Sequence, residues 1–91
     1  MHNYAINELT AAKNILDAIA ESKDTPTDHM AYMMAHGLAD IANEVDDEEV
    51  AYQVTGISEM MFVLSERRTD IKKPEARFLS RCINNALQVV A

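Results

Sequence analysis

Four residues in the first half of the sequence have side chains that bind metals and recur at helical spacing. His29, Met33, His36 and Asp40 follow one another in steps of four, three and four residues, so a helix would carry them on one face. Imidazole and carboxylate groups are ligands of divalent transition metals. The two imidazoles are two helical turns, about 10 Å, apart, so one ion would need a second helix or subunit. We expect no metal or cofactor here and keep a small metal-binding helical protein as an alternative.

The chain has one cysteine, which is a candidate nucleophile. Cys82 has no histidine near it in the sequence, and Arg81 is its only adjacent basic residue. A cysteine nucleophile needs a general base and an oxyanion site arranged around a pocket. The sequence also contains no glycine-rich phosphate loop, no Cys-x-x-Cys pair and no serine elbow. We predict a structural thiol, no catalytic residues and a protein that is not an enzyme.

Acidic residues are concentrated at one point of the chain. Five of six consecutive positions carry carboxylates, namely Glu44, Asp46, Asp47, Glu48 and Glu49. One or two of these groups can accept hydrogen bonds from the free amides at the start of a helix. The carboxylates that do not cap the helix repel one another. Two interpretations stay open: a solubilising loop, or a surface that binds a basic partner.

Charge is distributed unevenly along the chain. The formal net charge is −7, and residues 1–60 hold twelve acidic and two basic side chains, whereas residues 61–91 hold three and six. The basic residues of the second part are Arg67, Arg68, Lys72, Lys73, Arg77 and Arg81. A dimeric nucleic-acid-binding regulator that uses this region is an alternative function. The acidic balance of the whole chain, and the lack of a glycine-bearing turn between two short helices, make nucleic acid the less favoured partner.

Apolar residues recur every three or four positions in four segments, as they do in amphipathic helices. The predicted helices cover residues 4–21, 26–45, 47–67 and 74–90. Thr25 and Pro26 predict the start of the second helix, the acidic cluster that of the third, and Pro74 that of the fourth, after a polar connection over residues 69–73. The chain is therefore predicted to be all-α, a compact antiparallel four-helix bundle that forms a single domain over residues 1–91.

The apolar stripes on these helices predict the core. Its central residues are expected to be Leu16, Ile57, Leu64 and Ile83. In the second helix we expect a stripe of large residues with alanines beside it: Met30, Met34, Leu38, Ile41 and Val45, flanked by Ala31, Ala35 and Ala42. Small residues beside such a stripe allow a neighbouring helix to come close.

The third predicted helix is apolar over more than one face. Tyr52, Gly56 and Val63 lie outside its main stripe. A contiguous apolar surface beyond what one core stripe needs usually marks a contact. This excess predicts either a central position for the helix in the bundle or a homodimer contact.

The balance of these features favours a protein that binds another protein. In size, acidity and helix count the chain is similar to several small inhibitor, immunity and phage-encoded anti-defence proteins, although no motif carries the similarity. This implies an acidic interaction module that inhibits or regulates a partner, with a basic or nucleic-acid-binding protein as the first candidate. The apolar and aromatic residues expected to add contact area are Tyr32, Met33, Tyr52 and Phe62.

The expected location is the cytoplasm. The longest strictly apolar run, from Met60 to Leu64, is far shorter than the roughly 18 residues of a membrane-spanning helix. The first residues do not resemble a secretory signal, which has a basic region followed by an apolar block. A lone cysteine also fits a reducing compartment. We therefore expect no membrane partner.

Overall fold

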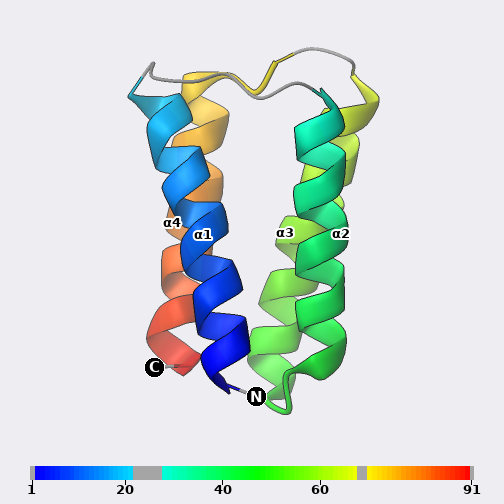
Figure 1. Cartoon of the computed structure of the whole chain (residues 1–91), viewed down its shortest axis with the longest axis vertical. Coiled ribbons are helices and arrows are strands. Elements are labelled where there is room, and N and C mark those ends of the chain that lie inside the picture. Colours follow the sequence, from blue (N-terminus) through cyan, green and yellow to red (C-terminus); the bar gives the residue numbers. More distant parts are fainter. Residues whose placement is uncertain (1, 22–27, 68–69, 91) are drawn as a thin grey trace.

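The computed structural model describes residues 2–21, 28–67 and 70–90, and side chains at residues 2, 28–30 and 90 lie outside the description. These ranges contain four helices: α1 (His2–Ala20), α2 (Asp28–Glu44), α3 (Glu48–Glu66) and α4 (Lys73–Val90). They pack as an antiparallel bundle with overall dimensions of 33 × 23 × 17 Å (Figure 1). The predicted all-α four-helix fold is confirmed.

The bundle consists of two close helix pairs. α1 packs mainly on α4, and α2 packs mainly on α3, whereas contacts between the two pairs are fewer. α1 and α2 form one broad face of the molecule, and α3 and α4 form the opposite one (Figure 1). The N-terminus of α1, the C-terminus of α4 and the α2–α3 turn lie together at one end, which we call the turn end.

The predicted core is confirmed in three of the four helices and modified in the second. Leu16, Ile57, Leu64 and Ile83 are all buried. In α2 the alanines at 31 and 35 are almost fully buried, together with Leu38 and Ile41, whereas Met34 and Val45 are only partly buried. α2 is thus turned so that its small residues, rather than Met34, lie deepest.

This rotation of α2 has a physical reason in its contact with α3. The Ser58 hydroxyl of α3 donates a hydrogen bond of 2.7 Å to the backbone carbonyl of Ala35. A side chain can reach a carbonyl of a neighbouring helix only if the two helices are close, and alanines allow that approach. Larger residues of α2 are consequently displaced toward the seam with α1.

The ends of the described helices follow local sequence signals. Asp47 caps α3, because its Oδ1 accepts hydrogen bonds from the backbone amides of Glu49 at 2.9 Å and Val50 at 3.1 Å. At the start of α4, the Glu75 carboxylate accepts from the backbone amide of Lys72 at 2.9 Å, as in one half of a capping box. The predicted start at Thr25 and Pro26 lies outside the described residues.

One prediction about the connection before α4 is wrong. The sequence predicts a polar connection over residues 69–73, yet Ile71 is only 3% exposed and belongs to the core. Its burial covers apolar surface at the end of the bundle opposite the turn end. An isolated apolar residue in a loop has no periodic neighbours, so pattern analysis does not detect it.

In the parts of the chain that the structure describes, no helix combines the length and the apolar character needed to cross a membrane.

Candidate functional site

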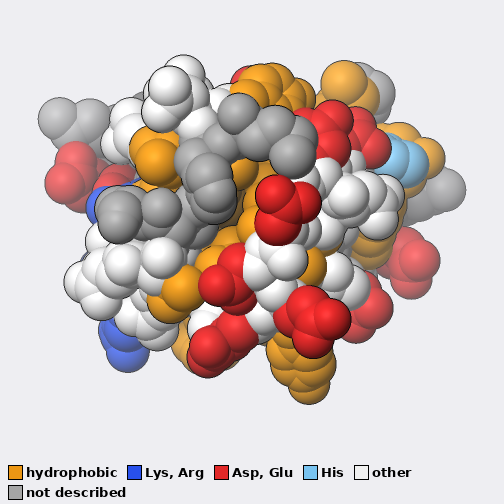
Figure 2. All heavy atoms as spheres, turned by 90° about the horizontal axis from the view of Figure 1, so that it is seen from below, with side chains coloured by type: hydrophobic (Ala, Val, Ile, Leu, Met, Phe, Trp, Pro, Cys, Tyr) orange, Lys and Arg blue, Asp and Glu red, His pale blue; other side chains and the backbone are white. Residues whose placement is uncertain are grey.

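The acidic residues predicted to bind a partner lie at the turn end, on or next to the α2–α3 turn. Glu44, Asp46, Asp47, Glu48 and Glu49 are all exposed there. Figure 2, which views the molecule from this end, shows acidic side chains spread across it with apolar side chains between them. Of the five, Asp47 is occupied by the cap of α3. Capping therefore leaves most of these carboxylates at the surface.

Two further carboxylates, which lie outside the acidic cluster of the sequence, belong to the same surface. Glu8 of α1, Asp40 of α2 and Glu44 all act on Tyr4, and together with desolvation they raise the pKa of its hydroxyl, with Glu8 as the largest cause. Neighbouring negative charges have this effect because they disfavour the phenolate. Acidic side chains from α1 and α2 therefore converge around Tyr4. We call the surface made by Tyr4, Glu8, Asp40, Glu44, Asp46, Asp47, Glu48 and Glu49 the acidic end.

The acidic end lies in a part of the molecule without basic side chains to neutralise it. The sequence has no Lys or Arg before Lys13, none from Asp24 to Glu66, and none after Arg81. α2, α3 and the turn between them therefore contain none at all. Among the described side chains, the acidic end therefore carries only negative formal charge.

The apolar residues proposed as contacts do not form one surface. Tyr32 and Phe62 lie together on the α2/α3 side, with ring centroids 5.7 Å apart. His36 packs edge-on against both, at 4.4 Å from Tyr32 and 5.0 Å from Phe62. Met33 instead lines a groove between α1 and α2, and Tyr52 is 78% exposed on α3. The sequence predicts His36 and Asp40 on one helix face but not the aromatic contacts of His36, although the four-residue step from Tyr32 signals one of them.

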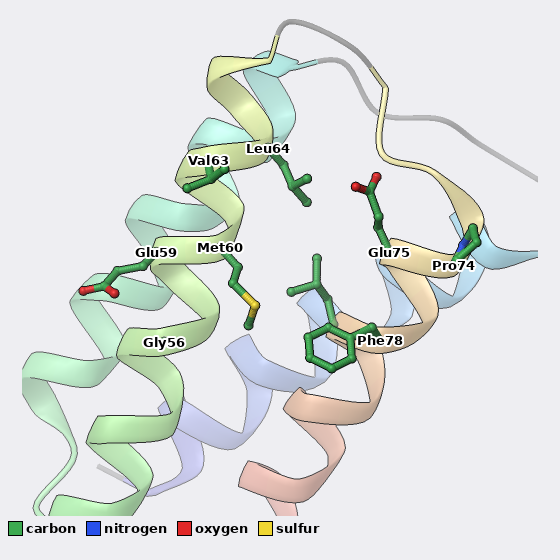
Figure 3. A pocket seen from close by; sticks show the side chains of 9 residues that line it. Gly56, Glu59, Met60, Val63, Leu64, Pro74, Glu75 and Phe78 are labelled. Carbon is green, nitrogen blue, oxygen red and sulfur yellow. The ribbon is translucent and has the colours of Figure 1, made fainter.

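A groove separates α3 from α4 on one broad face of the bundle. It has a volume of about 630 Å³, and Figure 3 shows side chains of both helices pointing into it. Met60 and Val63 contribute from α3, and Pro74 and Phe78 from α4. Val63 and Phe78 are more than half exposed. The groove is thus an open, mainly apolar seam between the two helix pairs.

A second, smaller groove lies on the opposite broad face, between α1 and α2. Its volume is about 280 Å³, and Ile15, Met33, Met34 and Gly37 are among its lining residues. Glu8 of the acidic end also lines it. Each of the two grooves therefore contains one of the protein's two glycines, since Gly56 lines the α3/α4 groove.

The predicted basic region is partly occupied by an ion pair within the chain. The Arg67 guanidinium binds the Glu75 carboxylate through two contacts, of 2.5 and 2.9 Å, which raises the pKa of Arg67 and lowers that of Glu75. Lys72, Lys73, Arg77 and Arg81 are exposed along the start and middle of α4. Arg68 lies outside the described residues.

The cysteine and histidine candidates show no arrangement for chemistry among the described residues. Cys82 is partly buried, and burial raises the pKa of its thiol despite the opposing effect of Arg81. A raised pKa leaves little of the nucleophilic thiolate. No group of three or more His, Cys, Asp or Glu side chains within the described part of the chain could hold a metal ion. The side chain of His29 is outside that part.

No protein-family model matches this sequence, and no curated protein or solved structure is detectably similar to it. The class that the fold defines is an antiparallel four-helix bundle. A function has to be argued from its surfaces.

Proposed function

We propose that this protein is a non-enzymatic interaction module that binds a basic surface of another protein through its acidic end, and thereby inhibits or regulates that protein. The observation that carries the proposal is the convergence of carboxylates from α1, α2, the turn and the start of α3 on one end that contains no Lys or Arg. Cap formation and solubility need fewer charges than this. A basic partner would neutralise the remainder.

The electrostatics of such a surface predict fast association. Exposed charges of one sign attract a partner of the opposite sign during diffusion and raise the association rate more than the final affinity. Tyr4, which is half exposed among these carboxylates, supplies apolar contact area within the charged surface. Tyrosine is enriched among residues that dominate interface energies. A nucleic-acid-binding protein is a suitable partner, because its basic surface already accommodates rows of negative charge.

The proposal is tested with a partner isolated by affinity purification from the native host. We expect Glu48→Gln together with Glu49→Gln to slow association at about 50 mM salt and to have little effect at about 500 mM, since the screening length falls from roughly 14 to 4 Å. Rates are measured by surface plasmon resonance. Thermal unfolding should be unchanged, because single exposed charges contribute little to stability.

The matched control is the pair Glu21→Gln and Glu66→Gln, two exposed carboxylates at the opposite end of the bundle. It changes the net charge by the same amount but leaves the acidic end intact. Association that slows equally in both double variants would show a net-charge effect rather than a binding surface. An unchanged rate at low salt in the Glu48/Glu49 variant would leave the acidic residues a solubilising role.

A nucleic-acid-binding regulator that uses α4 is a second proposal. It is supported by the exposure of Lys73, Arg77 and Arg81 on α4 and of Lys72 directly before it. It is weakened by the engagement of Arg67 with Glu75. A salt-dependent gel shift with nucleic acid, lost on Arg77→Gln with Arg81→Gln, would favour it over the first proposal.

A further inference from the structure

We propose that two copies of this chain associate through their α3/α4 grooves about a two-fold axis parallel to the helices. Phe78 of each copy then inserts into a recess on α3 of the other. This inference concerns a different face from the acidic end and does not depend on the function proposed above. It rests on the shape of the groove, on its exposed apolar side chains and on its charges.

The recess has the form that receives a side chain from another helix. Gly56, Glu59, Met60 and Val63 line the α3 side of the groove, and they stand at the first, fourth, fifth and eighth positions of a two-turn segment. Four residues with this spacing form the hole of knobs-into-holes packing. Gly56 has no side chain to fill the hole. The space beside it is open, because a Cβ placed there would have no atom within 4 Å. A glycine also weakens a helix relative to alanine, and no contact within the described chain makes use of its small size.

Phe78 has the position and exposure of a knob. It is 52% exposed and points into the groove from α4 (Figure 3). α3 and α4 are antiparallel, and Phe78 lies across the groove from Met60, one of the four recess residues (Figure 3). Rotation about a two-fold axis parallel to the helices does not change the height of a residue along that axis. It places α4 of the second copy opposite α3 of the first, and α3 of the second copy opposite α4 of the first. Phe78 of the second copy is thereby brought over the recess of the first.

The charges of this face select a second copy of the chain as the occupant. Arg67 and Glu75 neutralise each other within the chain. Glu59 lines the recess, and Arg81, three residues beyond Phe78, is exposed on α4 together with Lys73 and Arg77. The same axis places α3 of each copy over α4 of the other. Glu59 of each copy therefore faces Arg81 of the other copy, which gives two such pairs. The interface is therefore charge-complementary to itself.

The α1/α2 groove is not charge-complementary to itself. Glu8 lines it, and Asp40 and Glu44 act on Tyr4 beside it, so a second copy there would bring together carboxylates. These acidic residues belong to α1 and α2, the two helices of the broad face opposite the α3/α4 groove (Figure 1). At 0.15 M salt the screening length is about 8 Å, less than the 17 Å thickness of the bundle. Repulsion from that face therefore opposes the proposed dimer only weakly.

Sedimentation equilibrium of the full chain in 0.15 M salt tests the proposal. We expect a reversible dimer, and a dissociation constant at least about tenfold higher for Phe78→Ala, which removes the knob, and for Gly56→Met, which fills the recess. Gly37→Met is the matched control, because a Cβ placed at Gly37 would also have no atom within 4 Å and Gly37 lines the other groove. It should dimerise as the wild type does. Thermal unfolding verifies that each variant is folded.

A charge exchange tests the orientation of the two copies. Glu59→Arg and Arg81→Glu should each weaken the dimer, and the double variant should restore it. Glu48→Gln with Glu49→Gln should leave dimerisation intact, which separates this proposal from the acidic end. The proposal is overturned if the wild type remains monomeric up to about 500 µM, or if the dimer survives both Phe78→Ala and Gly56→Met. Binding of a different protein in this groove by a monomeric wild type would overturn it as well.

Discussion

The α1/α4 and α2/α3 pairs are joined in similar ways but differ in charge. Each pair has one buried serine that donates a hydrogen bond to its neighbour: Ser80 of α4 to Asp17 of α1 at 2.5 Å, and Ser58 of α3 to the Ala35 carbonyl at 2.7 Å. The acceptor is a titratable carboxylate in the first pair and a backbone carbonyl in the second. The hydrogen bond between α2 and α3 is therefore independent of pH, whereas that between α1 and α4 is not.

The charges of the two pairs follow the same division. α1 and α4 together carry four basic and three acidic side chains, whereas residues 28–66, which include α2, α3 and their turn, carry nine acidic ones and no Lys or Arg. The α1/α4 pair engages Asp17 internally, with Lys13 at 2.8 Å as well as Ser80. Among the described side chains, no carboxylate joins α2 to α3. Its acidic residues are thereby available for the surface, which is what a charged binding site requires.

The largest expected effect tests whether the two pairs fold as one unit. Ile57 of α3 and Ile83 of α4 are almost fully buried in one core cluster. We expect Ile57→Ala and Ile83→Ala each to lower the free energy of unfolding by about 2–5 kcal/mol. Urea denaturation should show a single transition for both variants, followed by circular dichroism. Two separate transitions would show that the helix pairs are independent.

The two serines provide the most direct comparison of the pairs. At neutral pH we expect Ser58→Ala to cost about 1 kcal/mol, the usual contribution of one hydrogen bond, and Ser80→Ala to cost a similar amount. Lys13 and then Ser80 lower the pKa of Asp17. The stability linked to Asp17 is therefore present above its unfolded pKa and lost as pH falls through its folded pKa.

The cost of Ser80→Ala should accordingly shrink in acid, while that of Ser58→Ala should stay constant. Chemical denaturation at neutral pH and at a series of acidic pH values measures both. Equal pH dependence in the two variants would contradict the assignment of Asp17 as the acceptor that distinguishes the pairs.

Replacing either of the two glycines on the broad faces by alanine should change the stability of the monomer in the same way. Gly37→Ala and Gly56→Ala are each expected to raise the free energy of unfolding by up to about 1 kcal/mol, because alanine is the better helix former and both sites have room for a Cβ. Thermal unfolding at low micromolar concentration, at which self-association contributes least, is the suitable measurement. A loss of stability at either site would reveal a close contact there.

The smallest expected effect concerns the ion pair that joins α3 to the start of α4. Glu75→Gln should cost less than about 1 kcal/mol at neutral pH, since the pair is partly exposed. Arg67 lowers the pKa of Glu75, so the effect is present above the unfolded pKa and disappears as pH falls through the folded one. Stability measured at neutral and acidic pH checks this. Arg67→Gln should weaken the same pH dependence, because Arg67 is the largest cause of the lowered pKa of Glu75.

Local signals in the sequence determined the helices and most of the core. The periodic spacing of apolar residues places Leu16, Ile57 and Ile83 on buried stripes, because in a helix the position along the chain sets the direction of each side chain. Asp47 caps α3 through amides only two and three residues away. The density of the acidic cluster is likewise a property of adjacent residues. None of these features depends on which helices become neighbours.

Tertiary packing decided the arrangement of the surfaces. A stripe shows that one side of a helix is apolar but not which neighbour covers it, so the close α2/α3 contact that buries Ala35 more deeply than Met34 was not predictable. For the same reason, Tyr32 and Phe62 came together while Tyr52 did not join them. Glu8 is far from the acidic cluster in sequence and reaches it only because α1 and α2 are neighbours. The grooves exist because two helix pairs meet, and a contact between distant segments leaves no local signal in the chain.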